Sequence, residues 1–214
     1  MPSTLRPLIT LALVLQGAPA MADACLDEVR AFYAQHLDPF ARRPHRTVTQ
    51  VYNPDGTPQR IFDAVIESPM RTIAGVAAES HYTLAIDSGV WNGPTHDGPW
   101  TDAGAGLPED RDAVMRLEHQ QRTANLRDAA CNGMVERDGR MLLNYAFSTQ
   151  SDPDPDRGGY FYGATHSLFV DPDTMEPQVW EMTAFVNPWS QAPGMDRHVV
   201  TFTYDDGIRL TAPE

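Results

Sequence analysis

Two stretches of the chain carry apolar residues at the three- and four-residue spacing of an amphipathic helix. The first runs from Asp27 to Ala41, and Pro39 and Pro44 are expected to end it. The second runs from Pro108 to Cys131, where a proline suits the first helical position and Glu109 and Asp110 suit the positive end of the helix dipole. Its apolar stripe is modest and consists of Val114, Leu117, Ala124 and Leu126.

Most of the remaining chain is typical of short strands joined by turns. Asn53-Pro-Asp-Gly56 and Asp138-Gly139 are strong turn signals between apolar runs, which indicates hairpins. We expect about nine strands, drawn from segments 47–52, 60–66, 71–76, 81–86, 90–92, 99–101, 134–137, 140–148, 160–170, 179–186 and 198–204. Strands at this spacing form an antiparallel sheet, so the predicted fold class is α+β.

Three of the predicted strands, at residues 140–148, 160–170 and 179–186, are apolar on both faces. A sheet with one solvated face would keep that face polar. One face can pack on the helices, while the other either lines a ligand cavity or is covered by loops or a partner. The pattern leaves both alternatives open.

The N-terminal residues have the order of a secretory signal peptide. Arg6 precedes an apolar run over residues 8–15, and Ala20-Met-Ala22 is typical of a cleavage site. The apolar run is shorter than the roughly 20 residues that cross a bilayer. We therefore expect residues 1–22 to be a cleavable signal peptide and residues 23–214 to be one α+β domain without a transmembrane segment. The expected location is the periplasm of a Gram-negative bacterium, or the medium.

Cys25 and Cys131 are the two cysteines of the chain. An even pair in an oxidising compartment predicts one disulfide between them. Cys25 also lies close enough to the cleavage site to suggest lipidation as an alternative, although Ala22-Asp23-Ala24 fits a lipidation triplet poorly.

Charge narrows the range of partners. The formal net charge is −13 at pH 7, which argues against nucleic acid and anionic membrane surfaces. All 16 basic residues are arginine, so a lysine nucleophile or Schiff base is excluded.

Motifs for chemistry are absent from the sequence, which contains no HExxH, GxSxG, GxGxxG or P-loop pattern. Residues 152–158 resemble the start of a calcium loop, but Arg157 and Gly163 stand where glycine and glutamate are required. Glu118-His119 fits a solvated helix face, and His166 fits a hydrogen-bonded wall histidine. We therefore assign no catalytic residue, metal ligand or cofactor, and whether the protein is an enzyme stays open.

Short segments carry a resemblance to a known family. Ile66-Glu-Ser-Pro-Met-Arg71 is similar to a strand entry of the periplasmic lipoprotein carrier LolA and its half-barrel superfamily. Val90-Trp91 and Asp97-Gly-Pro-Trp100 resemble another segment of that family. The resemblance implies a strongly curved antiparallel sheet that wraps an N-terminal and a central helix and encloses a hydrophobic cavity. The acidic charge and the cysteine pair depart from the carrier itself, so it implies binding of an apolar or lipid-like ligand rather than lipoprotein transfer.

The function expected from the sequence is binding or carriage of such a ligand in the half-barrel cavity. Large aromatic side chains on strands suit the wall of a lipid pocket. The predicted ligand-binding residues are Tyr82, Trp91, Trp100, Tyr145, Phe147, Phe161 and Trp180. Two alternatives remain: an envelope module whose acidic surface binds a protein partner, and a hydrolase whose site is assembled only on folding.

Overall fold

The computed structural model describes residues 18–190 and 192–213, so most of the predicted signal peptide lies outside the described residues. The two helices are α1 (Ala18–His36) and α2 (Arg111–Ala124), and short 3₁₀ turns occupy η1 (Ala77–Glu79) and η2 (Pro155–Arg157). The strands are β1 (His45–Tyr52), β2 (Pro58–Ser68), β3 (Arg71–Val76), β4 (His81–Ile86), β5 (Gly89–Gly93), β6 (Thr101–Asp102), β7 (Arg127–Arg137), β8 (Arg140–Gln150), β9 (Gly163–Val170), β10 (Pro177–Val186) and β11 (Arg197–Tyr204).

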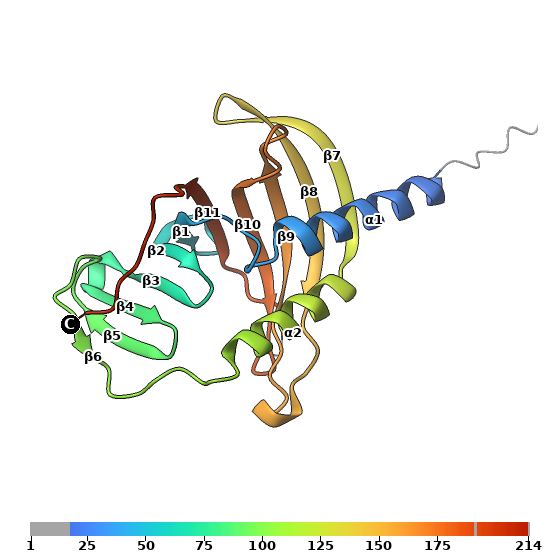
Figure 1. Ribbon diagram of the computed structural model, residues 1–214. Helices are drawn as coiled ribbons and strands as arrows, with labels where there is room; N and C mark the ends of the chain where they lie inside the picture. The colour runs from blue at the N-terminus through green and yellow to red at the C-terminus, as the bar shows by residue number, and fades with distance from the viewer. Residues whose placement is uncertain (1–17, 191, 214) are drawn as a thin grey trace, which may run out of the picture.

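All eleven strands belong to one antiparallel sheet in the order β6-β5-β4-β3-β2-β1-β11-β10-β9-β8-β7. Each half of the order is a meander, and the pairing of β1 with β11 joins the halves. The sheet is curved and open, and both helices lie across β7–β10 (Figure 1). The α+β fold with a large curved sheet and two helices is therefore confirmed.

Both helices differ from their predicted limits. Helix α1 ends at His36 rather than Ala41, because Pro39 disfavours a helical conformation at the residue before it. Helix α2 ends at Ala124, and the segment predicted as its last turns begins β7. Pairing of Arg127 with Ser148 and of Cys131 with Tyr145 supplies these residues with sheet partners, which overrides a weak helical pattern.

The predicted strand 160–170 is also shorter than expected. Strand β9 begins at Gly163, and residues 160–162 belong to the connection from β8. Asp154 accepts hydrogen bonds from the backbone N–H groups of Asp156 and Arg157, which fixes η2 and the turn of this connection.

One hydrophobic core lies between α1 and the β8–β9 part of the sheet. Fully buried side chains from α1 and from these strands meet there, with Leu126 from the α2–β7 connection. The members of this helix-side core are Val29, Phe32, Tyr33, Leu37, Leu126, Tyr145, Phe147, Leu168 and Val170.

A second core lies on the opposite face of the sheet. Directly paired residues of antiparallel strands point to the same face, and the pairing can be followed from Tyr145 in β8 through Trp180 and Thr49 to Phe62 in β2. Ala64, two residues after Phe62 in the same strand, shares that face. Val65, next to Ala64, therefore points away from the helices. The members of this tail-side core are Val65, Ile73, Tyr82, Leu84, Ile86, Ile208 and Leu210.

The predicted disulfide is present. Cys25 of α1 and Cys131 of β7 are bonded, with their Cα atoms 5.8 Å apart. The bond fastens the first helix to the edge strand of the sheet. A cysteine sulfur held in a disulfide cannot also carry a lipid, so the lipidation alternative at Cys25 is wrong for this structure.

Candidate ligand cavity between the helices and the sheet

A cavity of about 250 Å³ lies between the two helices and the sheet. Helix α1 contributes Tyr33 and Leu37, and the sheet contributes Trp180 of β10. The rest of the wall comes from the α1–β1 connection and from α2, namely Pro39, Arg42, Met115, Glu118, His119 and Arg122. The cavity thus combines an apolar and aromatic wall with charged side chains.

Helix α2 presents a mixed stripe to this cavity. Met115, Glu118, His119 and Arg122 recur at intervals of three, one and three residues, which places them on one helical face. No described residue of α2 is fully buried, and Leu117 is 54% exposed. The helix therefore supplies polar and charged side chains to the cavity wall and few buried apolar side chains to the core.

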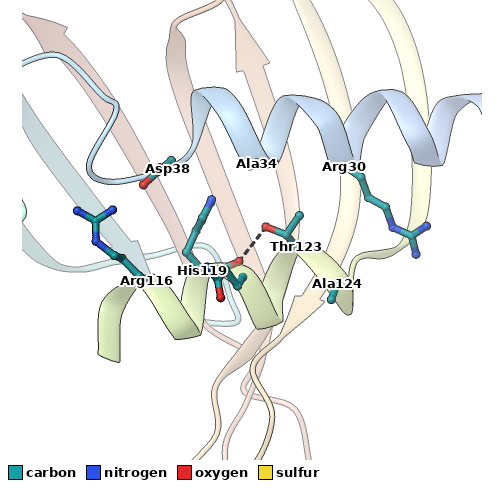
Figure 2. Close-up of a pocket in the computed structure, with 8 residues that line it drawn as sticks. Arg30, Ala34, Asp38, Arg116, His119, Thr123 and Ala124 are labelled. Carbon is teal, nitrogen blue, oxygen red and sulfur yellow. Dashed lines mark hydrogen bonds between the residues drawn. The ribbon is translucent and has the colours of Figure 1, made fainter. Parts of the chain in front are cut away.

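His119 borders this cavity and also an outer groove. The groove measures about 680 Å³ and runs between α1 and α2, lined by Arg30, Ala34, Asp38, Arg116, His119, Gln120, Thr123 and Ala124. In Figure 2 the His119 side chain points from α2 toward α1, and the Thr123 hydroxyl donates to the His119 carbonyl at 2.8 Å. The His119 ring stacks on Tyr33 with ring centroids 5.1 Å apart, so burial lowers its pKa. The glutamate–histidine pair expected on a solvated face instead borders the cavity.

The sheet side of the cavity carries a short hydrogen-bonded chain. The indole N–H of Trp180 donates to Nδ1 of His166 at 3.0 Å. Nε2 of His166 lies 2.8 Å from the hydroxyl of Thr149. The chain fixes the ring of Trp180, whose other surroundings include the helix-side core.

These partners fix the tautomer of His166. An indole N–H can only donate, so Nδ1 of His166 must be an acceptor and Nε2 must carry the proton. Burial lowers the pKa of His166 to about 3, so the ring is neutral near pH 7. His166 donates to Thr149 instead of accepting its proton, so this pair is not a nucleophile with its general base. The wall role predicted for His166 agrees with this geometry.

Two arginines give the cavity a positive character. Arg42 and Arg122 both line it, and the Nε of each is buried without a hydrogen-bond partner in the described chain. Desolvation lowers the pKa of Arg42, an effect that Tyr204, Tyr33 and Asp38 oppose. Arg122 lies over the ring of Tyr162, 5.2 Å from its centroid, and burial raises the pKa of that phenol to about 12.

The seven aromatic residues predicted from the sequence fall into separate groups. Tyr145 and Phe147 belong to the helix-side core, and Trp180 packs against that core and lines the cavity. Phe161 is half-buried in the β8–β9 connection. The remaining three, Tyr82, Trp91 and Trp100, belong to or pack against the tail-side core on the other face of the sheet.

Sequence reasoning missed the charged part of the cavity, Arg42 and Arg122 above all. The available signal was the spacing of Met115, His119 and Arg122, which repeats along one face of the helix. A search for apolar stripes passes over it because two of these side chains are polar. Arg42 gave no signal, since it follows the end of α1 and its surroundings come from distant segments.

Neither a metal centre nor a membrane-spanning helix is evident in the described residues. Across 18–190 and 192–213, no three histidine, cysteine, aspartate or glutamate side chains gather in a way that could hold a metal ion. No helix in the same ranges has both the length and the apolar character needed to cross a membrane.

No protein-family model matches the sequence, and no curated protein sequence matches it. Solved structures do resemble the fold. The lipoprotein LppX of Mycobacterium tuberculosis is 12% identical, with a TM-score of 0.50, and the match covers 88% of this chain and 99% of LppX. LprF of Mycobacterium bovis is 14% identical with a TM-score of 0.45, and the match covers 91% of this chain and 97% of LprF.

A LolA superfamily protein from Nitrosomonas europaea also matches, at 8% identity and a TM-score of 0.30, over 85% of this chain and 91% of that protein. At such identities the similarity concerns the fold alone. The large curved antiparallel sheet with two helices that the resemblance implied is thus shared with LppX, as a likeness of fold.

Proposed function

We propose that this protein is exported and binds an amphiphile, with the apolar part of the ligand held between the helices and the sheet. The observation that carries the proposal is the cavity bounded by Tyr33, Leu37, Met115 and Trp180. Ligand pockets are typically concave and mostly apolar, with a few placed polar groups. The fold of LolA-like proteins supports the same reading, and the disulfide is consistent with an oxidising compartment outside the cytoplasm.

The packing of α2 supports entry of a ligand larger than the cavity. Because no described residue of α2 is fully buried, moving the helix away from the sheet exposes little apolar surface. Helix α1, by contrast, is fastened by Val29, Phe32 and the disulfide. Ligand entry on the α2 side therefore costs less than on the α1 side.

Native mass spectrometry of protein purified without detergent tests the proposal. We expect a bound mass in the range of a lipid, or uptake of added oleate by protein stripped of bound lipid. Met115→Trp fills the cavity and should reduce uptake at least several-fold. Met141→Trp is the matched control, because Met141 is 52% exposed on β8 and should leave uptake unchanged. A ligand-free mass together with no uptake of any lipid probe would overturn the proposal.

A further inference from the structure

Two neighbouring arginines in the connection between α1 and β1 have opposite surroundings. Arg43 is exposed and binds two carboxylates, Asp206 and Glu176, each at 2.7 Å. Arg42 lines the cavity, and its buried Nε has no hydrogen-bond partner in the described chain. The ion pairs found among the described residues include Arg43 twice and Arg42 not at all.

Arg122 is only partly neutralised. Its terminal nitrogen lies 3.5 Å from one oxygen of Glu118, and its Nε is buried without a partner in the described chain. The other oxygen of Glu118 binds Arg157 more closely, at 2.8 Å. One carboxylate is therefore shared by two guanidinium groups at the edge of the cavity.

The carboxylate of Asp38 offsets part of the charge of Arg42 from outside the cavity. Asp38 borders the outer groove, and its Oδ1 accepts a hydrogen bond from the backbone N–H of Phe40 at 2.9 Å. The cavity thus contains two guanidinium groups and the single shared carboxylate of Glu118. Both arginines are half-buried, with the Nε of each shielded from water and unpartnered in the described chain. Positive charge that is partly removed from water is costly unless an anion offsets it. Its presence in a chain of net charge −13 makes it a specific feature rather than a consequence of composition.

We propose that Arg42 and Arg122 bind the anionic headgroup of the ligand, a carboxylate or a phosphate monoester, with the first carbons of its chain against Trp180 and Met115. Guanidinium groups form paired, charge-assisted hydrogen bonds with both kinds of oxyanion. This inference rests on the proposed function, because it names the ligand class of the same cavity. It goes further in requiring that the protein distinguish anionic from neutral amphiphiles.

The test compares three lipids with the same acyl chain on the full-length protein stripped of bound lipid. Oleate carries a carboxylate, 1-oleoyl lysophosphatidate carries a phosphate monoester, and glycerol mono-oleate is neutral. Affinities are measured by displacement of the neutral fluorescent probe 1-aminoanthracene. We expect at least one anionic lipid to bind about tenfold or more tightly than the neutral one, and the tighter of the two identifies the headgroup.

Arg42→Met should weaken binding of the preferred anionic lipid roughly 10- to 100-fold, the range expected for loss of a charged hydrogen bond. The affinity for the neutral lipid should change less than about threefold. Arg43→Met is the matched control and should leave all three affinities unchanged, since Arg43 binds carboxylates outside the cavity. Arg122→Gln should also weaken binding of the preferred anionic lipid.

Thermal unfolding separates a binding defect from a folding defect. Because the Arg42 Nε is buried without a hydrogen-bond partner in the described chain, Arg42→Met should leave the melting temperature unchanged or raise it. If that variant does not fold, Arg42→Gln takes its place, since it keeps a polar side chain of similar reach. Equal affinity for the three lipids, or an equal loss for all three on Arg42→Met, overturns the headgroup inference and leaves the proposed function standing. No binding of any lipid overturns both.

Discussion

His166 is held between a donor and an acceptor that determine its protonation state. Trp180 donates to one ring nitrogen and Thr149 receives from the other, so a second proton on the ring would lose the Trp180 hydrogen bond. Desolvation, reinforced by the charge of Arg122, lowers the pKa of His166 to about 3. The folded state therefore binds fewer protons than the unfolded state, whose histidine titrates near pH 6.5.

The free energy of unfolding should consequently fall as the pH is lowered from about 6.5 toward 3. Below pH 6.5 the histidine is protonated in the unfolded state but not in the folded state, which favours unfolding. The free energy of unfolding therefore decreases by on the order of 1 kcal/mol for each pH unit between about 6.5 and 3. His166→Gln keeps a donor and an acceptor without titrating and should give a flatter dependence in urea unfolding series. The exposed His81→Gln serves as the control. Parallel pH profiles for the unsubstituted protein and His166→Gln would contradict the assignment.

Phe147 shows why an aromatic residue predicted in a ligand site can act mainly in the core. Its side chain is 1% exposed and lies against Tyr33 and His166, with ring centroids 5.8 and 4.9 Å apart. Phe147→Ala should lower the free energy of unfolding by about 3–5 kcal/mol, measured in urea. Phe62→Ala is the control, since Phe62 is 37% exposed on β2. A small loss of stability combined with lost lipid binding would place Phe147 in the cavity wall instead.

At the scale of elements, strong local sequence patterns predict the limits of strands correctly, whereas weak patterns do not. The segments 71–76 and 81–86 match β3 and β4 residue for residue, because apolar alternation and flanking turns agree there. Residues 127–131 were predicted as helix because the residues before them are helical. Their conformation depends on β8, fourteen or more residues further along the chain, which a local pattern does not contain.

The disulfide joins helix α1 to the edge strand β7. Cys25 and Cys131 are 106 positions apart, so the bond restricts the unfolded chain strongly. In the chain-entropy model, a loop of this size corresponds to about 4–5 kcal/mol. The double variant Cys25→Ala/Cys131→Ala should lose stability of this order in urea unfolding. Unsubstituted protein treated with a phosphine reductant should unfold at the same urea concentration as the variant. An unchanged midpoint in both would show that α1 is held by its core contacts alone.

At the scale of the whole molecule, the sequence predicts that both faces of the sheet are apolar but not how the faces are covered. Strands that are apolar on both faces predict that one face packs on the helices. The other face is expected to line a ligand cavity or to be covered by loops or a partner. In the structure, the two halves of the sheet are covered on opposite faces. The helices cover one face at β7–β10, and residues 205–211 cover the other face at β2–β4 (Figure 1). The face of the sheet to which a residue points depends on the pairing register of every strand between the two halves. No single segment of the sequence contains that information. For that reason the sequence predicts one ligand-binding wall for both Trp91 and Trp180, whereas in the structure they pack against cores on opposite faces of the sheet.

The C-terminal tail takes the place of a helix over the β2–β4 face. Ile208 and Leu210 are buried in the tail-side core, and two polar contacts fasten the tail to β2 and β3. The backbone N–H of Leu210 donates to Glu67 at 2.7 Å, and Arg71 donates to the Leu210 carbonyl while pairing with Glu67. These contacts leave the backbone of the tail satisfied where it is buried, so the short segment can complete a core.

Ile208→Ala/Leu210→Ala should therefore destabilise one half of the sheet more than the other. Each truncation removes a buried aliphatic group, and losses of about 2–5 kcal/mol per site are expected. Because the two cores lie on opposite faces and share no residue, hydrogen exchange should accelerate in β2–β5 while amides of β8 and β9 keep most of their protection. The double variant Thr201→Ala/Thr203→Ala, at exposed positions of β11, is the control. Equal acceleration across all strands would instead show that the continuous ladder through β1 and β11 makes the sheet one cooperative unit. Preserved protection of β8 and β9 would mean that the half of the sheet that borders the ligand cavity keeps its structure without the tail.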